Sequence, residues 1–350
     1  MRWFWLALKL VLVAGLLLAF RQLAVPWIAE QAYLSRSRAT PMLPAARLTP
    51  QNAAQIAVLE KLSADEILPA GYQLLDVIWK SSERALLLIS RNDTLILSEF
   101  PQINQLQTWL ASPRVAGATW GAAQFSQDMR FVAAKYANQA RVYIVESGQP
   151  LSPWIASSEL FSLSPDGTRL AQAGTLGLSD DPSRVAVHKT SDGSQAALFK
   201  TRAFYWRDLT FSPDGALLVV LGDERQPSSA WMGRTPVFTW LNTIGNQVAI
   251  SGDGSVVATS SAIIFLKTRQ VIPLQYPPPS QTPWEVAFSP DGSLLVTQTV
   301  EGGLYFWRVS DGALLTSRGI PPGQAEIAFS PDGAMFSVLV ENYIVNWGLP

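Results

Sequence analysis

Short hydrophobic runs fill much of the chain and are separated by turns that contain glycine. In residues 284–315, Val286 and Phe288 are the hydrophobic positions of one run, and Leu294 and Val296 begin the next after a Pro-Asp-Gly turn. A two-residue period interrupted by such turns predicts antiparallel strands joined by hairpins. Proline presets the first turn position, aspartate can bond the backbone two residues on, and glycine takes the left-handed position.

The same turn recurs along the chain, so the pattern is a repeat. Clear copies read Ser-Pro-Asp-Gly or Ser-Gly-Asp-Gly and begin at Ser164, Ser212, Ser251, Ser289 and Ser330. Decayed copies lie at positions 126 and 80, and successive copies are 38–48 residues apart. Seven units of about 40 residues have room for four short strands each. They predict an all-β fold, a seven-bladed β-propeller of four-stranded blades.

The repeat resembles that of the WD-repeat family. Residues 288–292 read Phe-Ser-Pro-Asp-Gly, the family's turn, and residues 301–303 lie where the family has an Asp-Gly turn. Trp307 takes the place of the tryptophan in the family's Trp-Asp pair, and Trp347 takes it in the last unit. The resemblance therefore implies a propeller fold.

The chain also departs from the family pattern. Arg308 and Gly348 replace the aspartate of the Trp-Asp pair, and the only histidine, His188, is not part of a Gly-His pair. The family's internal His/Asp hydrogen-bond network is therefore absent, and a degenerate bacterial type is the better comparison. The resemblance covers residues 51–350 and says little about function, because one fold hosts many functions.

The last unit lacks one strand. Strands are expected over residues 334–339 and 343–347, after which the chain stops at Pro350. An open sheet edge would invite aggregation. We therefore expect a strand near residues 55–62 to complete the seventh blade and close the ring.

The first 28 residues predict a signal-anchor, a single transmembrane helix. Residues 3–20 are apolar apart from Lys9 and would span about 27 Å as a helix, close to a bilayer core. A cleaved signal peptide is the alternative, because residues 10–20 have the length of a signal-peptide core, but no convincing cleavage site follows Phe20. Residues 29–50 contain several prolines and predict a linker.

The orientation of this helix follows from its flanking charges. Arg2, Lys9 and the terminal amine hold the N-terminus inside, which places the propeller on the extracytoplasmic side. Arg21 and the arginines after it act in the opposite direction, and a propeller on the cytoplasmic face is the alternative.

Composition excludes several function classes. A formal net charge of −1 gives no electrostatic reason to bind nucleic acid. The chain has no cysteine, one histidine and no Gly-rich phosphate loop, so we predict no catalytic residue, cofactor or metal. His188 lies in an expected strand and is predicted to be a packed or surface residue.

The alternative to a non-catalytic protein is a lactonase-like or cyclase-like propeller enzyme. It would use carboxylates at the channel mouth, namely Asp76, Asp208 and Glu285.

Aromatic residues recur at the start of the innermost strands. Trp120, Trp206 and Trp284 each lie five or six residues before the aligned serine, where a propeller has its channel mouth. Two long loops are expected, at residues 176–182 and 222–236. The predicted partner-binding residues are Trp120, Tyr205, Trp206, Arg207, Arg225, Trp231 and Trp284. Blade packing is the alternative role for each tryptophan. The sequence thus predicts a non-catalytic, membrane-tethered scaffold for a protein or peptide.

Overall fold

The computed structural model describes most of the repeat region in segments. These are residues 47–63, 73–81, 84–91, 94–100, 107–109, 120–126, 129–156, 160–173, 184–201, 206–223, 226–241, 245–279, 281–340 and 343–350. Residues 1–46, with the predicted signal-anchor and most of the predicted linker, lie outside them. Within the described segments, no helix is long and apolar enough to cross a membrane.

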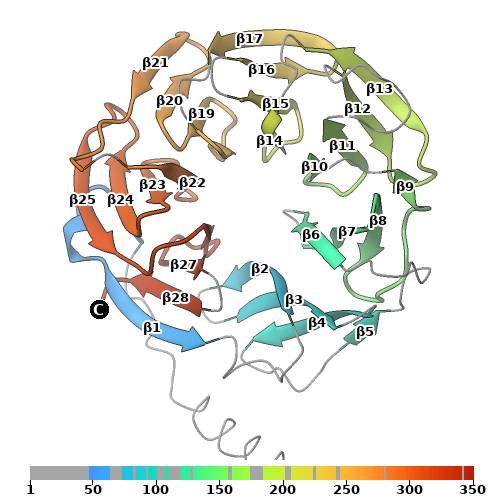
Figure 1. Ribbon diagram of the computed structural model, residues 1–350, viewed down its shortest axis with the longest axis horizontal. Coiled ribbons are helices and arrows are strands. Elements are labelled where there is room, and N and C mark those ends of the chain that lie inside the picture. The colour runs from blue at the N-terminus through green and yellow to red at the C-terminus, as the bar shows by residue number, and fades with distance from the viewer. Residues whose placement is uncertain are drawn as a thin grey trace, which may run out of the picture. The chain divides into compact units, whose positions relative to one another are not determined.

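Seven four-stranded antiparallel sheets surround a central channel, which confirms the predicted propeller (Figure 1). We number these blades in chain order. Blade 1 contains β2 (Gln73–Ser81), β3 (Arg84–Arg91), β4 (Thr94–Phe100) and β5 (Gln107–Trp109). Blade 2 contains β6 (Trp120–Phe125), β7 (Phe131–Tyr136), β8 (Gln139–Ile144) and β9 (Ile155–Ala156). Blade 3 contains β10 (Leu160–Leu163), β11 (Arg169–Ala173), β12 (Arg184–Lys189) and β13 (Gln195–Lys200).

The remaining blades repeat this order, with the first strand at the channel and the last at the rim. Blade 4 contains β14 (Trp206–Phe211), β15 (Leu217–Gly222), β16 (Pro227–Met232) and β17 (Thr235–Leu241). Blade 5 contains β18 (Val248–Ile250), β19 (Val256–Thr259), β20 (Ala262–Phe265) and β21 (Gln270–Pro273). Blade 6 contains β22 (Pro283–Phe288), β23 (Leu294–Thr299), β24 (Gly303–Arg308) and β25 (Leu314–Gly319). Blade 7 contains β26 (Ala325–Phe329), β27 (Met335–Val340), β28 (Tyr343–Gly348) and β1 (Ala57–Ser63).

The repeated turn has a structural role in the first hairpin of a blade. In blade 6, the buried hydroxyl of Ser289 donates to Asp291 Oδ1 at 2.6 Å and accepts from the Leu294 N–H at 3.0 Å. Gly292 has a φ of 70°, in the left-handed region that favours glycine. Blades 3, 4, 5 and 7 repeat the Ser-to-Asp bond. The motif therefore stabilises the turn between the first two strands of a blade, as its residues predict.

The core lies between neighbouring blades. Alternate residues of each strand point to opposite faces of its sheet, so each blade packs against a blade on both sides. Between blades 6 and 7, Phe306, Phe336 and Trp347 are buried, and the rings of Phe336 and Trp347 stack at 6.3 Å. The hydrophobic positions of the repeat thus form the seams of the ring.

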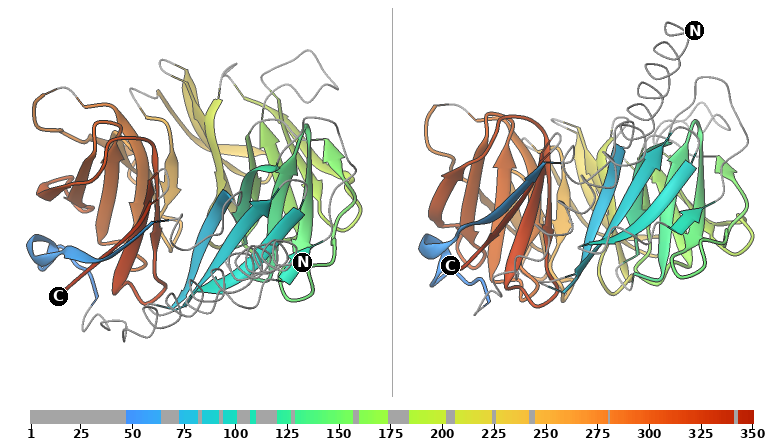
Figure 2. Two further views of the ribbon diagram at one scale, coloured as in Figure 1. Left: turned by 60° about the horizontal axis from the view of Figure 1, so that its bottom comes forward. Right: turned by 90° about the horizontal axis from the view of Figure 1, so that it is seen from below.

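The strand nearest the N-terminus is the outer strand of the last blade. β1 pairs antiparallel with β28, with Val58 opposite Trp347 and Leu62 opposite Ile344. Figure 2 shows β1, in blue, beside the red C-terminal strands. The predicted strand near residues 55–62 therefore corresponds to β1. The short helix η2 (Ala53–Gln55) precedes it, and Ala53 and Ile56 are buried against blades 6 and 7.

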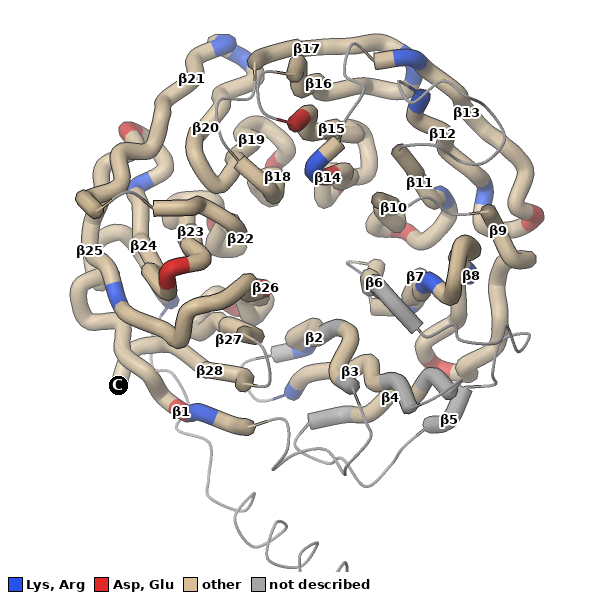
Figure 3. Tube along the Cα trace, viewed as in Figure 1, with Lys and Arg blue, Asp and Glu red and all other residues tan. Residues whose placement is uncertain are grey.

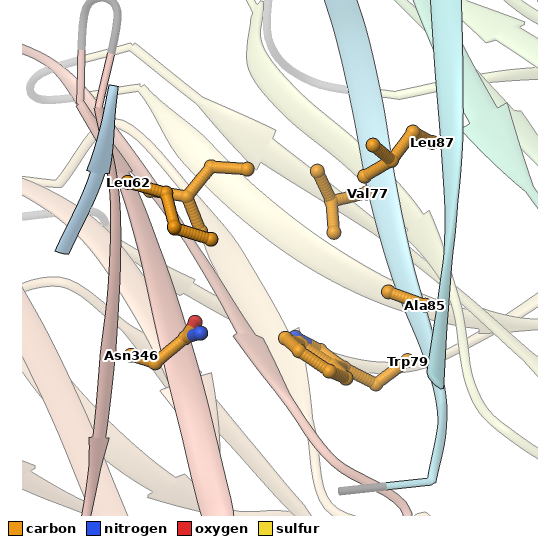
Figure 4. A pocket seen from close by; sticks show the side chains of 7 residues that line it. Leu62, Val77, Trp79, Ala85, Leu87 and Asn346 are labelled. Carbon is orange, nitrogen blue, oxygen red and sulfur yellow. The ribbon is translucent and has the colours of Figure 1, made fainter. Parts of the chain in front are cut away.

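A chain of hydrogen bonds crosses the seam where the ring closes. Ser337 Oγ accepts from Trp79 Nε1 at 2.9 Å and donates to Asn346 Oδ1 at 2.5 Å. Asn346 Nδ2 then donates to Glu60 Oε2 of β1 at 3.2 Å. A mainly apolar groove lies beside this chain, where Leu62 and Asn346 face Val77 and Trp79 (Figure 4). Blade 1, blade 7 and β1 are thus joined by side chains as well as by packing.

Candidate functional site

Acidic residues recur at one position of the innermost strands. Asp208, Glu285 and Glu326 each lie four residues before the aligned serine, on β14, β22 and β26. Asp76 holds the matching place on β2, opposite Leu88, although its side chain lies outside the described part. Because the innermost strands run in the same direction around the channel, these residues lie at one level near the start of each strand. We call this level the acidic layer.

The carboxylate of Asp208 bridges two blades. Its Oδ2 accepts from the Val248 N–H on β18 at 2.7 Å, and its Oδ1 accepts from the Leu209 N–H at 2.7 Å. Burial raises the pKa of Asp208 to about 6, against the lowering effect of these two N–H groups. The side chain keeps some contact with solvent while protein surrounds it. Asp208 therefore helps to hold blade 4 to blade 5.

Neutral side chains on other innermost strands also accept a hydrogen bond from a backbone N–H of the next blade. Gln124 Oε1 accepts from the Leu163 N–H of the next blade at 2.8 Å, and Ser162 Oγ accepts from the Phe211 N–H at 3.2 Å. An innermost strand is the edge of its sheet at the channel, and its unpaired N–H groups need acceptors. Part of the polar character of the channel wall is therefore structural.

Glu285 and Glu326 are the other members of the acidic layer whose side chains the structure describes. Burial raises the pKa of Glu285 well above its usual range, and the negative charges of Glu326 and Asp208 raise it further. The protein that surrounds Glu326 also raises the pKa of its carboxyl group, although the residue is exposed at the channel surface. Glu285 is therefore close enough to both Asp208 and Glu326 to feel their negative charges. The layer therefore favours protons or a positively charged ligand group.

The sequence prediction missed Glu326, and a signal for it exists. Glu326 lies four residues before Ser330, just as Glu285 lies four residues before Ser289. Aligning all seven units on the serine would have found it. Among the described residues, no group of three or more His, Cys, Asp and Glu side chains could hold a metal ion.

Two of the predicted tryptophans lie beside the acidic layer. Trp284 precedes Glu285 on β22 and Trp206 begins β14, and both are half-buried. Trp206 also packs against the cluster between blades 3 and 4, so part of its surface is structural. Trp120 begins β6, at the matching place of blade 2, but its side chain lies outside the described part.

Of the three polar residues predicted to bind a partner near the channel mouth, the structure describes Arg207. Arg207 is exposed on β14, and its Nε pairs with Asp223 Oδ1 at 2.5 Å. This ion pair joins the start of β14 to the turn after β15. Tyr205 and Arg225 lie outside the described residues, as does the predicted loop at 176–182.

The predicted long loop at residues 222–236 is wrong, and so is the placement of Trp231 in it. These residues contain β16 and the start of β17. Trp231 is 8% exposed, its ring stacks on Phe199 at 4.5 Å, and its Nε1 donates to Ser229 Oγ at 2.8 Å. The Pro-Ser-Ser sequence that begins β16 reads as a loop. Its serines instead satisfy buried donors, because Ser228 Oγ accepts from the Gly222 N–H at 3.0 Å. Trp231 is thus a core residue between blades 3 and 4.

His188 lies in a strand, as expected. It is half-buried on β12, opposite Leu170, and its Nδ1 lies 3.1 Å from the carbonyl oxygen of Gly193. The imidazole therefore contacts the turn that follows its own strand.

Comparison with known proteins agrees with the fold. No protein-family model matches the chain, and no curated protein matches it in sequence. A chain in a crystal structure of a mitotic checkpoint complex superposes with a TM-score of 0.64 at 15% identity. The match covers 84% of this chain and 96% of the other. At this identity the likeness concerns the fold alone.

Proposed function

We propose that the protein is a non-catalytic β-propeller scaffold that binds a protein or peptide at the channel mouth. In this proposal it is a degenerate bacterial WD-repeat propeller, tethered to the membrane by residues 1–28 with the propeller on the extracytoplasmic side. The supporting observation is that half-buried Trp284 and Trp206 lie beside Asp208, Glu285 and Glu326 at the same end of the innermost strands.

This combination fits a partner that brings both an apolar and a basic group. Tryptophan offers a large, rigid surface and is enriched among the residues that dominate interface energies. The carboxyl groups attract a lysine or arginine side chain and would orient it. The resemblance to a chain solved within a multi-protein complex agrees with a scaffold role, although likeness of fold does not fix function.

Binding tests with the full chain can examine the proposal. Trp284→Ala should weaken capture of the partner from membranes by roughly 30-fold, since an interface tryptophan contributes about 2 kcal/mol. Trp154→Ala is the matched control, because Trp154 is also half-buried but lies next to β9 at the rim of blade 2. Equal capture by both variants and by the unchanged chain would refute the channel-mouth site.

The tether is tested separately. The full chain should stay in the membrane pellet after washing with alkaline carbonate, and its N-terminus should be Met1 or close to it. A mature N-terminus beyond Phe20 would establish a cleaved signal peptide instead.

A second candidate function is catalysis by the acidic layer. The raised pKa values of Asp208 and Glu285 favour it, since acid–base catalysts often have shifted pKa values. Such an enzyme, lactonase-like or cyclase-like, would use Glu285 as a general acid. Hydrolysis of a panel of lactones by the purified chain, lost in Glu285→Gln, would support catalysis over the scaffold.

A further inference from the structure

The outer strand of blade 4 differs from the other outer strands. β17 has seven residues and carries no charge, and Figure 3 shows it without a charged position. By contrast, β1 carries Glu60 and Lys61, β13 carries Lys200 and β25 carries Arg318. The others, β5, β9 and β21, have only two to four residues. Charges and short length are the usual protection of sheet edges.

The two faces of β17 have different surroundings. Phe238 and Trp240 turn inward between blades 4 and 5, where their rings stack at 5.7 Å. On the other face, Leu241 is 67% exposed and Val237 is 36% exposed. Val237 and Leu241 therefore place exposed apolar side chains along an edge that no described strand covers.

The backbone of β17 is paired on one side. Its partner is β16, in a register that runs from Pro227 opposite Leu241 to Ala230 opposite Phe238 and then shifts at a bulge, so that Trp231 lies opposite Pro236 and Val237 is the extra residue. In the described sheets no strand pairs with its outer edge. Every second residue of an antiparallel edge strand directs its N–H and C=O groups outward. Proline has no N–H, so Pro236 limits a continuous ladder to residues 237–241.

The geometry favours a single extended segment over a second copy of this chain. Five residues of β-strand are about 17 Å long. Two convex rims that meet along such a line would bury far less than the ~1,200 Å² of a stable dimer. A single peptide strand needs only that line, because its main-chain hydrogen bonds provide much of the affinity and its alternate side chains provide specificity.

The side chains of β17 define the chemistry of that segment. With no charge between Thr235 and Leu241, a charged residue opposite them would lose hydration without gaining a counter-ion. Val237 and Leu241 instead favour apolar or β-branched cross-strand neighbours. We propose that residues 237–241 form a strand-addition surface for an extended, uncharged segment of a partner protein with alternating apolar side chains. This surface lies at the outer rim, apart from the channel mouth.

Selection of peptides tests the surface without knowledge of the partner. Random twelve-residue peptides displayed on phage are selected against the immobilised full chain, and enriched peptides are synthesised. We expect uncharged sequences with alternating apolar residues whose binding slows hydrogen exchange of residues 237–241. Val237→Lys should weaken their binding by at least ~10-fold. Val271→Lys, on the outer strand β21 with 44% of the valine exposed, is the matched control and should not.

Two further measurements guard against a folding defect. Leu241→Lys alters the most exposed side chain of the strand and should give the same loss at an unchanged melting temperature. With the unchanged protein, N-methylation of one alternate set of peptide residues should abolish binding, while methylation of the other set should be tolerated. The proposal is overturned if the peptides bind Val237→Lys and Leu241→Lys as tightly as the unchanged chain. It is also overturned if binding survives methylation of either set of peptide residues. A dimer of the free chain that Val237→Lys dissociates would also overturn it, in favour of a second copy.

Discussion

The indole Nε1 of Trp79 donates a hydrogen bond to Ser337 Oγ across 258 residues of sequence, at 2.9 Å. Trp79 belongs to the first blade and Ser337 to the last, and both are buried. Together with the bonds from Ser337 to Asn346 and from Asn346 to Glu60, this contact joins the two ends of the repeat array. Ring closure therefore depends on specific polar contacts as well as on β1.

Removal of the Ser337 hydroxyl should destabilise the ring. Ser337→Ala leaves the Trp79 indole N–H and the Asn346 carbonyl oxygen buried without this partner. An unsatisfied buried group costs about 1–3 kcal/mol. We expect the free energy of unfolding in urea to fall by roughly 2–4 kcal/mol. Ser317→Ala, at an exposed serine of β25, is the control and should change it by less than about 0.5 kcal/mol.

The closing strand should be indispensable to the propeller. A chain that begins at Arg47 keeps buried Leu48, whose N–H donates to the Gly333 carbonyl at 2.8 Å, and keeps β1. A chain that lacks residues 1–62 exposes the edge of β28. We expect the shorter chain to aggregate or to melt far below the longer one in calorimetry. Equal melting temperatures would mean that β1 contributes little to closure.

Replacement of Trp231 should lower the stability of the fold and leave partner binding unchanged. Truncation of a buried tryptophan typically costs 3–5 kcal/mol, so Trp231→Ala should lower the free energy of unfolding by about that amount. Met232→Ala, at the adjacent position where the side chain is 55% exposed, should change it by about 0.5 kcal/mol or less. Partner binding measured well below the melting temperature should be similar for both. A specific loss of binding in Trp231→Ala at unchanged stability would contradict the core assignment.

Stability should rise as the pH falls from 7 to about 5. Asp208, Glu285 and Glu326 have raised pKa values in the folded state, so the folded protein binds protons there more readily than the unfolded chain. For such groups stability falls as pH rises. For Asp208 the window lies between the ordinary aspartate pKa of about 4 and its folded value of about 6.

Glu285→Gln should reduce this pH dependence and raise the melting temperature at pH 7, by roughly 2 °C for each kcal/mol of repulsion removed. Glu301→Gln is a control outside the layer, because hydrogen bonds from Thr282 lower the pKa of Glu301. Identical pH profiles for Glu285→Gln and the unchanged chain would show that the acidic layer does not destabilise the fold.

The opposite trend should follow below pH 4. Asp214 and Asp253 in the repeated turns have lowered pKa values, chiefly because the turn serines donate to their carboxylates. Groups of this kind stabilise the fold above the unfolded pKa, and that contribution is lost as pH falls through the folded pKa. Calorimetric melting temperatures should therefore peak between about pH 4 and 6. A melting temperature that rises steadily below pH 4 would contradict this role of the turns.

The repeat and its turns can be recognised from the amino-acid sequence, because their chemistry is local. Ser289, Asp291 and Gly292 form their turn from bonds that span five residues or fewer, so the motif can be recognised wherever it occurs. Alternation then assigned the strands, and the count of units predicted the ring. The shared position of Asp208, Glu285 and Glu326 was also present in the sequence, once the units are aligned on the serine.

Which side chains are buried, and which neighbours bury them, depends on how the blades pack against one another. Trp231 belongs to the core because Phe199, on the neighbouring blade, stacks on it. Asp208 joins blade 4 to blade 5 because the N–H of Val248, 40 residues later, donates a hydrogen bond to its carboxylate. The uncharged edge of β17 could be recognised only after the supposed loop proved to be two strands. Burial and edge position depend on the neighbours that folding brings together, and the local sequence does not specify those neighbours.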